Sequence, residues 1–143
     1  MKIKILVSGK IKETRYASKA KEYLKWISSQ VSLDLVFLKD NDLKKLSDKQ
    51  IHSLDPAYFS ISLSEEGKGF SSKEFSNFIY SINKDLIFIL GPPDGLSEKL
   101  KESTDFILSM SKFTLPHELA YLVLLEQIYR AMSIQNGSKY HRA

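Results

Sequence analysis

Residues 86–90 constrain the fold more than any other stretch of this sequence. They read LIFIL and are apolar at every position. A run this short is typical of a β-strand, and a strand without a polar face is typical of the centre of a parallel sheet, where helices cover both faces. The stretch therefore predicts an α/β fold.

The rest of the chain supplies matching strands and helices. Apolar alternation or short apolar runs predict further strands at residues 3–7, 33–38, 58–63 and, briefly, 110–113. Three- and four-residue apolar spacing or capping residues predict helices at 13–29, after 39–42, from 71 or 72, from 97 to about 108, and at 118–132. The alternation predicts a mostly parallel sheet with helices on both faces, and the length of 143 residues predicts a single domain, 1–143.

Composition narrows the classes of function. The chain has no cysteine, and His52, His117 and His141 are too far apart for a familiar zinc spacing, so we expect no metal. No signal peptide or membrane-spanning run is evident, which favours a cytoplasmic protein that contacts no membrane. The net charge of +4 favours a polyanionic partner, although a lysine-rich proteome would give the same value.

Ligands of open α/β sheets gather beyond the carboxyl ends of the strands. Three loops qualify here: Leu63 to Gly69, Gly91 to Leu96, and Ser111 to His117. The second loop, GPPDGL, matches neither a dinucleotide fingerprint nor a P-loop, so a plain structural turn stays an alternative. In the third loop Thr114 is a candidate helix cap, and His117 fits a capping or packing role better than that of a catalytic base.

The last predicted helix is apolar around nearly its whole circumference. We expect it to be either sandwiched inside the monomer or shared with a second subunit, and a homodimer with Leu124 and Ile128 in the interface is the favoured interpretation. The polar tail beyond it ends in Tyr140-His141-Arg142. Such a tail is either an expendable chain end or a group that stacks on an RNA base and pairs with phosphate.

Several motifs together resemble one family. They are the opening MKIKILVSGKIKE, the LxxxGK loop at 63–68, GPPDGL, TLPHEL, LLEQIYRA and the terminal YHR. With these motifs in this order, the chain resembles the RlmH family. The members of this family are SPOUT-class methyltransferases that modify N3 of a pseudouridine in 23S ribosomal RNA. The resemblance implies a deep C-terminal trefoil knot, a homodimer, S-adenosyl-L-methionine as methyl donor, no metal, and rRNA of the large subunit or the assembled ribosome as partner.

The resemblance also implies roles for individual residues. The donor would be held, largely through backbone groups, by Leu63, Gly91, Ser111, Lys112, Phe113, Thr114, Leu115 and Pro116. His141 or Arg142 would favour the deprotonated N3 of the target base, and Tyr140 would position that base. Lys10, Lys12 and Lys139 are candidates for phosphate contacts.

This chain departs from the family pattern at three positions. Pro92 stands where a second glycine is usual, Ser64 where an acid is usual, and Tyr121 where an arginine is common. Pro92 has no backbone N–H, so one expected hydrogen bond is in question. The alternatives are a catalytically inactive ribosome- or RNA-binding protein of the same fold, and a flavodoxin-like nucleotide-binding protein, which leaves the YHR tail without a role.

Overall fold

The structure, a computed structural model, describes residues 1–142; Ala143, the last residue of the predicted domain, lies outside this range. Its five strands form one sheet in the order β2-β1-β4-β3-β5. The bounds are Lys2–Ser8 (β1), Ser32–Leu38 (β2), Tyr58–Gly69 (β3), Asp85–Leu90 (β4) and Phe106–Ser109 (β5). Every neighbouring pair is parallel. The LIFIL stretch is the central strand β4 and is buried throughout, as predicted.

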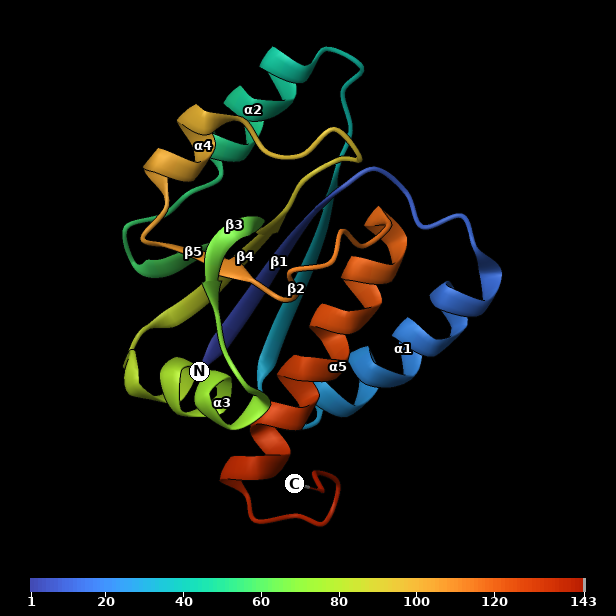
Figure 1. The fold of residues 1–143 in the computed structure, drawn as a ribbon, viewed down its shortest axis with the longest axis vertical. Coiled ribbons are helices and arrows are strands. Elements are labelled where there is room, and N and C mark those ends of the chain that lie inside the picture. Colours follow the sequence, from blue (N-terminus) through green and yellow to red (C-terminus); the bar gives the residue numbers. More distant parts are fainter. Residues whose placement is uncertain (143) are drawn as a thin grey trace.

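Helices cover both faces of this sheet (Figure 1). On one face α5 (His117–Gln135) packs between α1 (Thr14–Ser28) and α3 (Ser72–Ser81). On the other face α2 (Leu43–His52) packs beside the short α4 (Glu98–Ser103). The predicted α/β class with a parallel sheet and helices on both faces is confirmed.

The core has two parts because side chains alternate between the faces of each strand. From β4, Leu86, Phe88 and Leu90 join the larger core under α1, α3 and α5. Ile87 and Ile89 join the smaller core under α2 and α4. This two-sided burial explains why the strand has no polar position.

Helix α5 is sandwiched inside the chain, the first of the two arrangements that its composition allowed. Leu124 and Ile128 are fully buried against the sheet, so the expectation that they form a subunit interface was wrong. Other apolar side chains of the helix are only partly buried, among them Leu119, Leu122, Val123 and Tyr129.

The boundaries around β5 also differ from the prediction. Helix α4 ends at Ser103, and the strand is Phe106–Ser109 rather than 110–113. Asp105 fixes this register, because its carboxylate accepts hydrogen bonds from the backbone N–H and the hydroxyl of Ser60 on β3, at 2.8 and 3.1 Å. Residues 110–116 are consequently a loop.

Strand β3 continues past residue 63 to Gly69, with an irregular register against β5 between Leu63 and Lys68. The loop predicted at 64–69 is therefore an extension of β3, which we call the β3 extension. Among residues 1–142, no helix combines the length and the hydropathy needed to cross a membrane.

Candidate functional site

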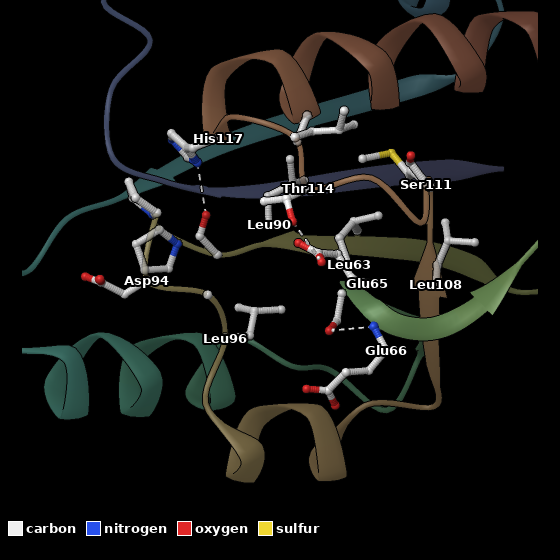
Figure 2. A pocket seen from close by; sticks show the side chains of 18 of the residues that line it. Leu63, Glu65, Glu66, Leu90, Asp94, Leu96, Leu108, Ser111, Thr114 and His117 are labelled. Carbon is white, nitrogen blue, oxygen red and sulfur yellow. Dashed lines mark hydrogen bonds between the residues drawn. The ribbon is translucent and has the colours of Figure 1, made fainter.

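A cavity of about 510 Å³ opens where β3, β4 and β5 end (Figure 2). Most of its wall comes from three segments: the β3 extension, the loop 91–96 after β4, and residues 110–117 between β5 and the start of α5. These are the three segments that the sequence indicated. The apolar part of the wall includes Leu63, Leu90, Leu96, Leu108, Met110 and Leu115.

The loop 91–96 needs its first glycine for steric reasons. A Cβ on Gly91 would lie 2.9 Å from the Leu96 side chain and 3.0 Å from the Gly95 backbone. Gly95 has a φ of +85°, which favours glycine, and its N–H donates to the Pro92 carbonyl at 2.8 Å. Pro92 lacks a donor, but its carbonyl closes this turn, so the departure from the family pattern leaves the loop compact.

The β3 extension lies directly on β5. A Cβ on Gly67 would lie 2.4 Å from the Ile107 carbonyl oxygen. Any side chain would therefore collide with β5, so this position requires glycine. The two preceding residues connect the extension to its neighbours. Glu65 accepts a hydrogen bond from the Thr114 hydroxyl at 3.1 Å (Figure 2). Glu66 accepts one from the Lys101 ammonium at 3.0 Å. Thr114 thus connects the loop after β5 to the β3 extension. It does not cap α5, because the N-cap of this helix is Pro116, which makes no side-chain hydrogen bond.

Lys101 on α4 is an unusual member of this wall, because its side chain is only 6% exposed. Its ammonium lies 2.7 Å from Glu98 and 3.0 Å from Glu66. The hydrogen bond to Glu98 raises the pKa of Lys101 above its ordinary value. Burial lowers this pKa, but the hydrogen bond to Glu66 also raises it, and the net shift is upward. The ammonium therefore stays charged at neutral pH.

His117, the first residue of α5, connects this helix to the loop 91–96. Its Nδ1 lies 3.0 Å from the Gly91 carbonyl oxygen, which can only accept, so the ring donates from Nδ1 (Figure 2). Its Nε2 is buried and has no hydrogen-bond partner within residues 1–142. His117 thus has the packing role favoured from the sequence, with an added contact that positions the loop.

The structure brings most of the predicted donor-binding residues to this cavity. Leu63, Gly91, Ser111, Phe113, Thr114 and Leu115 line it. Lys112 and Pro116 do not: Lys112 is exposed, and Pro116 lines a neighbouring hollow beside the start of α1. Phe113 is 83% exposed, an unusual state for an aromatic side chain on a cavity wall.

The Tyr140-His141-Arg142 tail is not part of this cavity, and a network on α5 holds it elsewhere. The Tyr140 hydroxyl donates to Glu126 at 2.8 Å, and the Arg130 guanidinium donates to the same carboxylate and, at 3.0 Å, to Nδ1 of His141. Burial and the hydrogen bonds to Tyr23 and Glu126 raise the pKa of Tyr140. Arg142 is exposed.

Burial alone would raise the pKa of Glu126, but hydrogen bonds from Arg130 and Tyr140 outweigh it and lower the pKa below its ordinary value of 4.5. Glu126 is consequently an ionised centre that holds the tail. Neither Glu126 nor Arg130 received a role from the sequence, although both lie in the LLEQIYRA motif.

The cavity and the tail are well separated within one chain. An α-helix rises about 1.5 Å per residue, so the His141 partner Arg130 lies about 20 Å along α5 from His117. In Figure 1 the tail folds back beneath the far end of α5, away from the loops of the cavity. One chain does not bring the predicted donor and target-base residues together.

Comparison with known proteins agrees with this geometry. The sequence profile of the family described as "Predicted SPOUT methyltransferase" matches residues 1–141. The "Ribosomal RNA large subunit methyltransferase H" of Dictyoglomus thermophilum is 38% identical over 99% of this chain and 99% of its own. The protein of the same name from Streptococcus suis is 38% identical over 99% of this chain and 100% of its own.

This chain belongs to the RlmH family of SPOUT methyltransferases. A solved structure, titled "The structure of a probable methylase family protein from Haemophilus influenzae Rd KW20", has the same fold at a TM-score of 0.59. It is 11% identical and covers 99% of this chain and 70% of its own. Within residues 1–142 no His, Cys, Asp and Glu side chains are grouped so that three of them could hold a metal ion.

Several members of the cavity wall had no signal in the sequence. Glu65, Glu66 and Lys101 look like ordinary solvated charges, and only the fold shows that Lys101 is buried. The predicted phosphate-binding residues Lys10, Lys12 and Lys139 are exposed and lie outside the cavity wall.

Proposed function

We propose that this protein transfers the methyl group of S-adenosyl-L-methionine to N3 of a pseudouridine in 23S rRNA of the large subunit. The observation that carries the proposal is the convergence of the three RlmH-like loop motifs on one cavity. Residues 1–143 would act as one methyltransferase domain, in the cytoplasm where ribosomes are found. The deep trefoil knot belongs to the same proposal.

The cavity residues fit the chemistry of this donor. The volume of about 510 Å³ lies within the range of about 300–1,000 Å³ that is usual for small-molecule sites. The leucine side chains offer an apolar slot for adenine. Glu65, Glu66, Asp94 and Glu98 outnumber the one lysine of the wall, which favours a ligand with a cationic sulfonium.

The donor, when bound, supplies a methyl group on a positively charged sulfur. The residues of the chain then have to align it with the nucleophile, since alignment provides much of the acceleration of such a displacement. Gly91 and the segment 111–115 would orient the donor. Tyr140 would position the base, while His141 or Arg142 would favour the N3 that has lost its proton.

The separation of cavity and tail within one chain supports a homodimer, in which the tail of each subunit completes the cavity of the other. The exposed Phe113 at the cavity rim and the partly buried Leu119, Leu122, Val123 and Tyr129 of α5 are candidates for the interface. Exposed Lys10, Lys12 and Lys139 would contact rRNA phosphates.

A mixing experiment tests donor binding and the shared site together. One variant, Gly91→Val, fills the cavity loop, and a second lacks Tyr140 to Ala143; each alone should fail to methylate ribosomes lacking the modification. Coexpressed at equal amounts, half of the dimers contain both variants, and each of these has one complete site. The mixture should therefore regain about a quarter of the wild-type rate.

Calorimetry supplies the control, because the tail-deleted variant should bind S-adenosylmethionine like the wild type. Absence of rescue in the mixture would refute the shared site. Absence of saturable donor binding by the wild type would favour the alternative, a catalytically inactive protein of this fold that binds the ribosome.

A further inference from the structure

Lys101, Glu66 and Glu98 form an ion triad at one side of the cavity. All three residues line it, and they come from two elements, the β3 extension and α4. The Lys101 side chain is 6% exposed, whereas those of Glu66 and Glu98 are 65% and 74% exposed. The Lys101 side chain is thus mostly covered but still lines the cavity, and its two partners are open to a ligand.

The triad has hydrogen-bonding capacity left over. An ammonium has three N–H donors, and the partners of Lys101 within residues 1–142 are the two carboxylates, at 3.0 and 2.7 Å. Each carboxylate accepts up to four hydrogen bonds, and solvent reaches most of both side chains. The triad can therefore bind one further anion at the lysine and one further cation at the glutamates.

The ion pairs alone do not explain why a lysine occupies this position. Pairs with exposed carboxylates contribute little to stability, and the burial of an ammonium is costly. An apolar side chain would fill the same space without that cost. The lysine at position 101 thus contributes little to stability but places a positive charge on the wall of the proposed donor site.

We propose that the triad binds the amino-acid end of S-adenosylmethionine, with Lys101 donating to its carboxylate and Glu66 or Glu98 accepting from its ammonium group. The inference rests on the proposed function and names the subsite for one end of that donor. In Figure 2 the Glu66 side chain points toward α4, away from Thr114 and His117, so the triad and the loop 111–117 face different parts of the cavity. The apolar wall between them fits the adenosine end.

Three ligands that share the adenosine group test this assignment. S-adenosylmethionine and S-adenosylhomocysteine carry the amino-acid end, and 5′-methylthioadenosine lacks it. For Lys101→Met we expect the Kd of the first two to rise about tenfold or more, as for loss of a charged hydrogen bond, and the Kd of methylthioadenosine to change less than about twofold. The matched control is Lys99→Met, an exposed lysine on the same helix that does not line the cavity.

An equal loss of affinity for all three ligands would assign Lys101 a purely structural role and overturn the inference. The same conclusion would follow if no affinity changed. If Lys101→Met fails to fold, Lys101→Gln retains an N–H donor without the charge and should show the same ligand pattern in weaker form. A wild type that binds none of the ligands would instead refute the proposed function, so the two failures are distinguishable.

Discussion

The cavity and the tail are built in different ways. Around the cavity, chain segments approach so closely that Gly67 and Gly91 have no room for a Cβ, and residues 86–90 of the central strand β4 are buried. The tail depends on side chains: one carboxylate, Glu126, binds both Tyr140 and Arg130. The cavity is thus rigid before any ligand arrives, whereas the tail can be released by breaking a few hydrogen bonds.

Helix α5 joins the two regions and also keeps them apart. It begins with His117 on the cavity wall, and its buried residues fix it between α1 and α3. The tail of the same chain reaches the cavity only by leaving Glu126 and crossing the length of this helix. In the proposed homodimer, the tail of the second subunit would reach the cavity without this rearrangement.

Gly67→Ala should disrupt the cavity wall, and we expect it to have the largest effect on stability and donor binding. The new Cβ would collide with the Ile107 carbonyl at 2.4 Å, so the β3 extension has to leave β5. We expect the free energy of unfolding in urea to fall by about 2–4 kcal/mol and donor binding to be lost. Gly69→Ala is the control, since its Cβ has an ordinary contact at 3.9 Å. Equal behaviour of the two variants would contradict the close approach at Gly67.

Glu126→Gln should weaken the hydrogen bonds that hold the tail and leave the cavity unchanged. The glutamine keeps the shape but loses the negative charge and one of the two acceptor oxygens that Arg130 and Tyr140 share. We expect ribosome methylation to slow by about tenfold or more, for a charged hydrogen bond worth about 1.5–3 kcal/mol, with an unchanged Kd for S-adenosylmethionine. A parallel loss of donor affinity would show that the two regions are not independent.

The pH dependence of stability gives a second measure of the same variant. Because the folded state lowers the pKa of Glu126, its contribution is present above the ordinary value of 4.5 and is lost as the pH falls through the folded pKa. The wild type should be more stable than Glu126→Gln at neutral pH, and urea unfolding should show this gap closing as the pH falls from about 4.5 through the lowered pKa of Glu126. A gap that does not change with pH would assign the effect to packing.

The sequence predicts the rigid region better than the side-chain network. LIFIL identified the central strand, because only apolar residues suit a strand covered on both faces. The resemblance in the loop motifs indicated Leu63 and Gly91, and both residues line the cavity. Lys101 could not be found, since a lysine on a short helix is usually solvated and its burial is visible only in the folded chain, where Glu66 of the β3 extension contacts it. The apolar surface of α5 was equally ambiguous: a sandwich inside the chain and a subunit interface require the same composition, so Leu124 and Ile128 were misassigned.

His117 tests the connection between the two regions, with the smallest expected effect. His117→Leu removes the hydrogen bond to the Gly91 carbonyl, and we expect donor affinity measured by calorimetry to fall about fivefold, for roughly 1 kcal/mol. The same change also removes Nε2, a buried polar atom without a partner, so the free energy of unfolding should stay unchanged or rise. His117→Asn can still donate from nearly the position of Nδ1 and should bind the donor like the wild type. A His117→Leu protein that loses stability and affinity together would make His117 a core residue, whereas affinity lost alone would make it the contact by which α5 sets the cavity loop.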